Sequence, residues 1–146
     1  MAGLTAVARR ARAASLAWLA GLLLAGTLAG CTALIPHPWV GGWQLRTVGG
    51  QPAAGQPTLS LSSTDVVIET GCNEGAGGYT YQDPMLTLSG MAFTASACAS
   101  AVLTAQDAAV VAIARGPVVM HVSGDELTID PGSGGAVLVF DRTSGA

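Results

Sequence analysis

The sequence contains no lysine and only two histidines, and charged residues make up 10% of its 146 positions. Its six basic residues are all arginines, against nine acidic residues. Nucleic-acid binding requires a cluster of basic side chains that displaces counterions from phosphates. The chain does not supply such a cluster, so we expect no nucleic-acid partner. Aromatic residues are also scarce, at 5%, and we expect most of them in the core.

The residues that commonly carry catalysis are also few. His121 is the single histidine of the predicted domain, and it lies in an apolar segment on the face shared with Val119, which predicts a surface strand residue rather than a general base. No GxSxG nucleophile turn is present. Calcium prefers six to eight oxygen ligands, more than Glu69, Glu74 and Asp83 provide, so we interpret these carboxylates as solvated turn residues. We expect no catalytic residue, no metal and no cofactor.

The first 30 residues have the pattern of an export signal. Residues 1–12 hold three arginines and no acidic residue, and Ala13–Gly30 is apolar and uncharged. This order is typical of a secretory signal peptide, which is removed from the mature protein. An uncleaved anchor is an alternative, because about 20 apolar residues suffice to span a bilayer. Pro36 and Pro38 interrupt the second half of the uncharged run and favour cleavage.

The end of this segment predicts lipid attachment. Leu28, Ala29, Gly30 and Cys31 match the bacterial lipobox, in which the cysteine becomes the first mature residue and carries acyl chains such as palmitate. Two or more acyl chains hold a protein firmly on a membrane. We therefore expect an extracytoplasmic protein, anchored by lipid to the outer face of a cytoplasmic membrane or to an outer membrane. An ordinary secreted protein is the alternative.

The predicted organisation is a signal peptide over residues 1–30, a tether over residues 31–40 and one domain over residues 41–142. After removal of the signal peptide, three arginines face all nine acidic residues, a formal charge of 3 − 9 = −6. Such a domain is repelled by anionic headgroups. Membrane attachment is therefore expected to come from the lipid.

The three cysteines leave an odd one in an exported protein, and lipidation of Cys31 accounts for it. Cys72 and Cys98 then remain, and two thiols outside the cytoplasm tend to oxidise. A disulfide between them would close a loop of about 27 residues, worth roughly 3.5 kcal/mol on the chain-entropy model. Reactive or metal-bound thiols are the alternatives. The metal alternative is weak because the spacing is not CxxC.

Short strand-like segments separated by turn residues predict a mainly β domain, an antiparallel sandwich or barrel. The segments are Trp43–Val48, Thr58–Ser63, Asp65–Glu69, Gly78–Gln82, Met85–Gly90, Pro117–Val122, Glu126–Asp130 and Ala136–Asp141. One α-helix is expected at about 102–114, capped by Thr104, with Asp107 near its positive end. Arg115, Gly116 and Pro117 form its stop signal.

The stretch Thr70–Tyr81, TGCNEGAGGYTY, is rich in glycine and in this respect resembles an anion-binding loop. It lacks both the GxGxxG pattern and the GK[ST] of a phosphate loop. We predict instead a turn in which Gly75, Gly77 and Gly78 adopt positive φ and Tyr79 begins the next strand. Asn73 suits a left-handed or side-chain-bonded turn position.

Four short motifs follow one another in a characteristic order. They are G-W-x-L with Gly42, Trp43 and Leu45; G-C-N with Gly71, Cys72 and Asn73; the pair Gly78 and Tyr79; and T-x-x-x-C with Thr94 and Cys98. Over Val40–Asp141 the chain resembles the META domain, or HslJ-like, family. It departs from that family before G-C-N, where Val67, Ile68 and Glu69 stand in place of a frequent glycine. It also departs in the helix, where Gln106, Asp107 and small aliphatic residues stand in place of a usual glutamate and aromatic residue.

The resemblance implies a curved antiparallel sheet or small barrel packed by one α-helix, without established catalytic residues. It also implies a role in envelope integrity or stress tolerance. We predict a monomeric, non-catalytic lipoprotein that binds an envelope protein or ligand. The alternative is a carrier or sensor of a small apolar ligand inside the barrel, which would need a cavity of roughly 300 Å³ or more. A thiol enzyme is a third alternative. The aromatic residues available to line such a cavity are Trp39, Trp43, Tyr79, Tyr81 and Phe140.

Overall fold

The structure is a computed structural model and describes residues 37–144. The predicted signal peptide, its lipobox and Cys31 lie outside the described residues. Within the described part, no helix is both long enough and apolar enough to cross a membrane.

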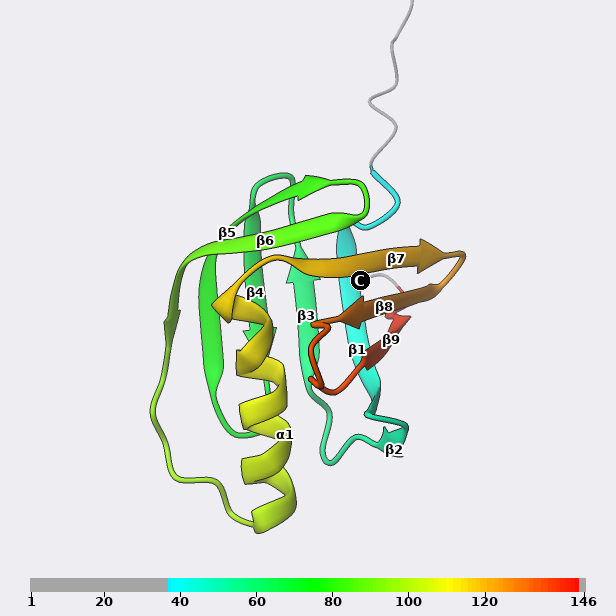
Figure 1. The fold of residues 1–146 in the computed structure, drawn as a ribbon. Helices are drawn as coiled ribbons and strands as arrows, with labels where there is room; N and C mark the ends of the chain where they lie inside the picture. The colour runs from blue at the N-terminus through cyan, green and yellow to red at the C-terminus, as the bar shows by residue number, and fades with distance from the viewer. Residues whose placement is uncertain (1–36, 145–146) are drawn as a thin grey trace, which may run out of the picture. The chain divides into compact units, whose positions relative to one another are not determined.

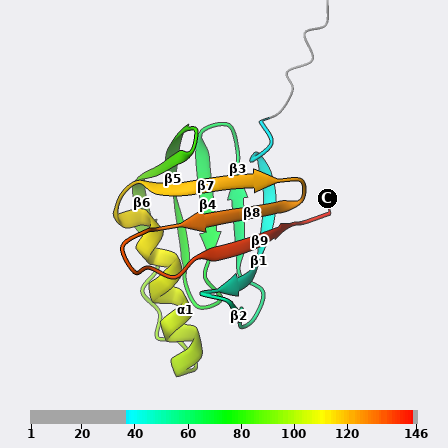
Figure 2. The same ribbon diagram turned by 45° about the vertical axis from the view of Figure 1, so that its right-hand side comes forward.

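The strands form one antiparallel sheet that closes on itself (Figures 1 and 2). Neighbours pair in the order β2-β1-β3-β4-β5-β6-β7-β8-β9, and β9 also pairs with β1. The two-residue β2 only extends the end of β1, so eight strands make up the barrel. The bounds are β1 Gly41–Val48, β2 Gln51–Pro52, β3 Thr58–Leu61, β4 Asp65–Glu69, β5 Glu74–Gln82, β6 Met85–Phe93, β7 Val118–Ser123, β8 Glu126–Asp130 and β9 Leu138–Arg142. The prediction of a small antiparallel barrel is confirmed, and the sandwich alternative is wrong.

Alternation of apolar and polar residues points one face of each strand into the barrel. Leu59 and Leu61 of β3 are buried while Ser60 between them is exposed, as expected for side chains that alternate across a strand. The same pattern holds in β4 and β8. The fully buried side chains are Trp43, Leu59, Leu61, Val66, Ile68, Leu86, Ile113, Met120, Leu127, Ile129, Leu138 and Phe140. Large side chains therefore fill the interior.

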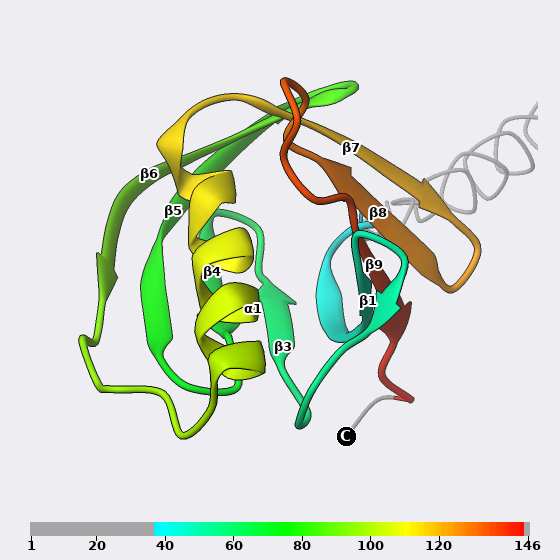
Figure 3. The ribbon, with the colours of Figure 1, turned by 60° about the horizontal axis from the view of Figure 1, so that its bottom comes forward.

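The helix covers a part of the sheet that the strands leave open. β6 pairs with β7 only through Met85–Val119 and Leu86–Val118, so the two strands separate beyond these pairs. Figures 1 and 3 show α1, Ala101–Ala112, against the concave face of the sheet on this side. A 3₁₀ turn, Ile113–Arg115, continues it.

The predicted helix bounds are close to those observed, but its cap is not. Ser100 is the N-cap, and its hydroxyl accepts a hydrogen bond from the Leu103 amide at 3.2 Å. The predicted cap, Thr104, lies inside α1 and donates its hydroxyl to the Ser100 carbonyl at 2.9 Å. Asp107 lies beyond the first turn of α1, and its carboxylate bonds to the Thr70–Glu74 corner instead.

Strand β5 begins at Glu74, four residues before the start of the predicted segment Gly78–Gln82. None of Gly75, Gly77 and Gly78 has positive φ; all three lie within β5. The first two are required by close packing, because an added Cβ would overlap the Phe93 ring at Gly75 and the Met91 sulfur at Gly77. The positive φ of the turn is at Gly71. Glycine therefore allows β6 to lie close to β5, and the turn prediction for this stretch is wrong.

Candidate functional site

The G-C-N motif forms a corner between β4 and β5. Gly71 has φ +90, a conformation that favours glycine. A Cβ there would also lie 3.1 Å from the Gln106 amide nitrogen and 3.3 Å from the Ala54 carbonyl. The chain thus turns at the one residue that tolerates both the conformation and the close contact with α1.

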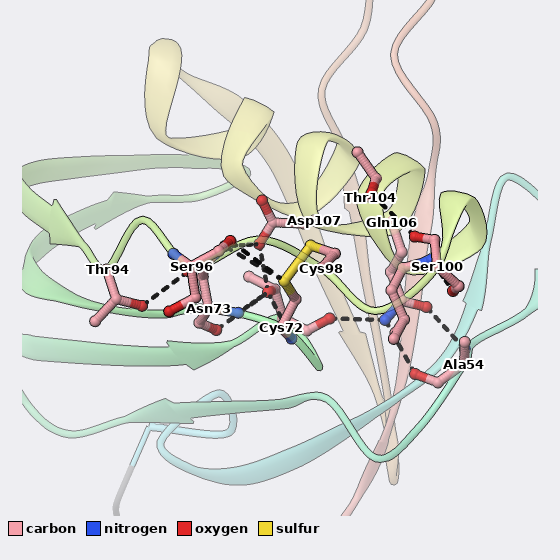
Figure 4. Close-up of a disulfide and its surroundings, with 12 residues drawn as sticks. Ala54, Cys72, Asn73, Thr94, Ser96, Cys98, Ser100, Thr104, Gln106 and Asp107 are labelled. Carbon is pink, nitrogen blue, oxygen red and sulfur yellow. Dashed lines mark hydrogen bonds between the residues drawn. A yellow bond between two sulfur atoms is a disulfide. The ribbon is translucent and has the colours of Figure 1, made fainter.

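Asn73 connects this corner to two other segments, as Figure 4 shows. Its side-chain oxygen accepts hydrogen bonds from the Ser96 amide at 2.7 Å and the Thr94 hydroxyl at 3.0 Å. Its amide nitrogen donates to Asp107 at 3.2 Å and to the Ser96 carbonyl at 3.3 Å. Both ends of the carboxamide are therefore used, as the side-chain-bonded interpretation of Asn73 predicts. Its φ is not positive, so the left-handed alternative is wrong.

Residues that the sequence did not single out complete the connection to α1. The hydroxyl of the buried Thr70 donates to the Asp107 carboxylate at 2.5 Å and accepts a hydrogen bond from the Asn73 backbone amide at 2.8 Å. Gln106 is only 5% exposed, and its side-chain amide bonds to the Thr70 carbonyl and to both backbone groups of Ala54. Gln106 and Asp107, which belong to the helix segment that departs from the family pattern, thus bind the corner.

A disulfide joins Cys72 to Cys98, with the Cα atoms 5.3 Å apart, inside the usual range for such bonds. The two sulfurs and a carboxylate oxygen of Asp107 lie within 4.8 Å of one another, a cluster with the donor types of a metal site. Metal ligation requires thiolates, and these sulfurs are bonded to each other. The pairing predicted by the cysteine count is present, and the oxidised pair offers no nucleophile.

The surface at the corner is a shallow hollow of about 280 Å³. Its lining residues are Glu69, Gly71, Cys72, Asn73, Glu74 and Thr94. Glu69 and Glu74 face each other across β4 and β5 and are exposed. Asp83, grouped with them in the sequence, lies at the opposite end of β5, where its carboxylate accepts a hydrogen bond from Tyr81. The three carboxylates therefore do not form one site.

The remaining motif residues are structural. Gly42 lies against Thr143, whose side chain would overlap an added Cβ. Trp43 is fully buried and donates its indole N–H to the Trp39 carbonyl at 2.9 Å, and Leu45 is also buried. Tyr79 is nearly buried and donates its hydroxyl to the Ser62 carbonyl at 2.6 Å.

His121 lies exposed on β7, opposite Thr128 on β8. It is therefore the surface strand residue that the sequence predicts. Buried side-chain nitrogen and oxygen atoms without a hydrogen-bond partner, which often mark a ligand site, do not occur among residues 37–144. The polar side chains of Thr70, Asn73, Gln106 and Asp107 are hydrogen-bonded to one another or to backbone groups of the corner.

A second feature lies where the chain enters the barrel. The His37 ring stacks on the Trp39 ring, with centroids 4.5 Å apart. The Trp39 ring contacts the Tyr81 ring in a tilted arrangement, with centroids 4.4 Å apart. The Trp39 indole donates to the Tyr79 hydroxyl at 3.2 Å. Arg142 fixes the backbone of this segment through the Pro38 and Val40 carbonyls. Residues 37–40, assigned to the tether from sequence, thus contact the domain.

Burial raises the pKa of Tyr81 above its usual 10.0, with the Asp83 hydrogen bond and charge as further causes. Tyr81 and Trp39 are half-buried, whereas Trp43, Tyr79 and Phe140 belong to the core. We name the surface formed by His37, Trp39 and Tyr81 the entry patch. The prediction that most of the aromatic residues lie in the core is confirmed, and Trp39 and Tyr81 pack against that core from the surface.

Replacement of Asn73 is expected to loosen the corner. Asn73→Ala removes the four hydrogen bonds to Thr94, Ser96 and Asp107 and a longer one to the Cys72 sulfur, and it should lower the free energy of unfolding by about 2 kcal/mol. Asn73→Asp keeps the size but sets a second carboxylate against Asp107, so it should destabilise more at pH 7 and recover part of that loss at pH 4. Urea unfolding followed by circular dichroism measures both.

Gln82→Ala, an exposed amide at the end of β5, is the control and should change stability by less than about 0.5 kcal/mol. Wild-type stability of Asn73→Asp at pH 7 would contradict the role given to the Asn73–Asp107 contact.

These features define a small closed antiparallel β-barrel with one covering helix and a disulfide-linked corner. The family model described as the META domain matches residues 39–144, so the chain belongs to the META domain family. The family resemblance predicted from the motifs is confirmed.

Two solved structures are similar to this chain. One, described as an NMR structure of a protein, has a TM-score of 0.62 and 20% identity and covers 70% of this chain and 88% of its own. An NMR structure of a protein from Burkholderia xenovorans has a TM-score of 0.52 and 20% identity, with 71% and 82% covered. At this identity the likeness shows the fold alone. None of the curated proteins matches the chain.

Proposed function

We propose that this META domain protein is a non-catalytic lipoprotein of the bacterial envelope, anchored through Cys31, whose domain surface binds another envelope component. One observation carries the non-catalytic part of the proposal: the polar side chains of the family motif bond to each other and to α1. A group so engaged holds the fold and is not free to act on a substrate. The lipobox and the preceding apolar segment support the anchor.

The filled barrel favours this function over a carrier of an apolar ligand. Trp43, Met120, Leu127 and Phe140, among others, fill the interior where a ligand would have to lie. Barrels of this size are either packed by side chains or hold one small molecule. The outer surface, rather than the interior, is then the part of the domain available for binding. A role in envelope integrity or stress tolerance would follow from such a partner.

Lipidation is tested by Cys31→Ser. The wild-type protein is expected in the membrane fraction with an acyl mass on its N-terminal peptide, and Cys31→Ser is expected to lack the acyl mass and to leave that fraction. The Cys72→Ser, Cys98→Ser pair is the matched control, because it removes two cysteines and leaves the lipobox intact. Soluble wild-type protein without acyl mass would overturn the anchor.

Thiol titration of Cys31→Ser tests the non-catalytic assignment. The two remaining cysteines are expected to form the disulfide, so no thiol should react until the chain is unfolded and reduced. A reactive thiol in the folded variant would favour the enzyme alternative. Recovery of partners with the lipidated wild-type protein from native envelope would then identify what the surface binds.

A further inference from the structure

We propose that the entry patch contacts the headgroup region of a zwitterionic membrane and fixes the orientation of the barrel on it. This inference rests on the proposed lipid anchor. It adds a contact surface to that anchor, made by His37, Trp39 and Tyr81.

The covalent chain limits how far the patch can lie from the lipid. Cys31 precedes His37 by six residues, and each residue spans at most about 3.6 Å, so the two Cα atoms are separated by no more than roughly 22 Å. A folded domain of about 100 residues has a radius of gyration of about 13 Å. The end of the barrel that carries the entry patch is therefore held close to the bilayer surface, whichever way the rest of the domain turns.

The chemistry of the linking segment favours close contact with lipid. The run Cys31–Leu45 contains no charged side chain, and Ala33, Leu34 and Ile35 are apolar. A linker that held the domain away from the membrane would be expected to be polar and longer. The short apolar link, His37 and Trp39 therefore lie in one continuous uncharged segment of sequence.

The side chains of the patch are of the kind that prefers the membrane–water interface. Trp and Tyr combine an apolar ring with a polar atom, and they are enriched at the headgroup level of membranes. Trp39 and Tyr81 lie half-exposed beside the exposed His37. The Arg142 hydrogen bonds to Pro38 and Val40 fix this segment on the barrel, so the rings need not be ordered on binding.

The charges near the patch select the lipid. Asp83 accepts a hydrogen bond from the Tyr81 hydroxyl, and Asp125 pairs with Arg142, which donates to the Pro38 carbonyl. Asp65 bonds to Ser62, whose carbonyl accepts the hydroxyl of Tyr79, the partner of the Trp39 indole. Three acidic side chains against one basic side chain are repelled by an anionic surface. The patch therefore fits neutral or zwitterionic headgroups. The contact needs little energy, because the anchor already makes it intramolecular.

The test uses the mature chain from Cys31, with the Cys31 thiol coupled to a maleimide lipid in phosphatidylcholine nanodiscs. Chemical coupling supplies the anchor, so the result does not depend on whether cells lipidate Cys31. A paramagnetic headgroup lipid should enhance relaxation at the backbone amides of residues 39 and 81, which every variant retains, at least about threefold more than at those of Val102 and Gly50, because the ends of the domain are about 25 Å apart. Figure 1 shows the start of α1 and the β1–β2 turn at the end of the domain opposite the start of β1.

Two variants separate orientation by the patch from orientation by a short tether. Trp39→Ala with Tyr81→Ala should reduce the difference between the two ends in the short-tether chain, and should abolish it when eight Gly and Ser residues are also inserted after Thr32. Val102→Ala, which shortens a side chain that is 64% exposed, should keep the difference in both chains. An insertion of eight Gly and Ser residues after Thr32 should keep it also, because the rings and not the tether length set the orientation.

Equal relaxation enhancement at both ends of the wild-type domain would overturn the proposal. Loss of the difference between the two ends after the insertion would overturn it also. The buried Trp43 indole resonance reports in each variant whether the barrel is folded. Failure of the cellular acyl-mass experiment with success here would remove the proposed anchor and leave the lipid affinity of the patch. An acyl mass in cells together with equal relaxation at both ends in the nanodiscs would support the lipid anchor and rule out the contact of the entry patch with the membrane.

Discussion

Trp43→Ala is expected to lower the free energy of unfolding by about 3–5 kcal/mol, the usual cost of truncating a buried aromatic side chain. Trp43 is 0% exposed and is the largest side chain of the core. Its indole N–H bonds to the Trp39 carbonyl, and the Arg142 guanidinium lies 4.0 Å above its ring. Such a loss is a large part of the roughly 5–15 kcal/mol that stabilises a domain.

Trp39→Ala is the matched control, since the same side chain is removed from a half-exposed position. It should cost no more than about 2 kcal/mol, because less apolar surface leaves water there on folding. Urea unfolding followed by far-ultraviolet circular dichroism compares the stabilities of the two variants without depending on tryptophan fluorescence, which each substitution changes. Equal losses for both variants would contradict the central position of Trp43 in the core.

Local patterns in the sequence predict most strands but not their full lengths. β8 was predicted at its observed bounds because Leu127 and Ile129 alternate with polar residues. β5 was cut short because Gly75 and Gly77 resemble turn residues, and only the Phe93 and Met91 side chains of β6 show why glycine is needed there. Closure of the barrel through β1 and β9 joins segments about 95 residues apart, a contact that local periodicity does not encode.

In the site also, local sequence predicts which residues matter but not which distant residues they contact. Asn73 and Cys72 stand out in the sequence because of their motif, and the cysteine count indicates the pairing with Cys98. In the sequence, Gln106 and Asp107 are noticeable only as departures from a family pattern. Their bonds to the corner could not be predicted locally, because these bonds span 34 to 52 residues. Asp107 was predicted to act on the helix dipole. Its carboxylate instead accepts from the corner, and only the packing of α1 on the sheet determines this.

Loss of the Cys72–Cys98 disulfide is expected to lower the free energy of unfolding by roughly 3.5 kcal/mol. The bond closes a loop of about 27 residues, and chain-entropy models give this value for a loop of that length. Cys72→Ala with Cys98→Ala measures the loss by urea unfolding without a reductant. Cys31→Ser leaves the disulfide intact and should unfold like the wild type, which separates the bridge from the predicted lipid site. An unchanged midpoint in the double variant would contradict the role of the bridge.

Asn73 spans the same two segments as the disulfide, so the two contributions should not be additive. The Asn73 bonds to Ser96 require residues 94–98 to stay beside the corner, and the bridge holds them there. Once the cysteines are replaced, Asn73→Ala should therefore cost less than it does in the bridged protein. A double-mutant cycle is expected to give a coupling of about 1 kcal/mol, within the range for residues in one network. Strict additivity would mean that Asn73 and the disulfide stabilise the corner independently, and that the hydrogen bonds alone keep residues 94–98 in place.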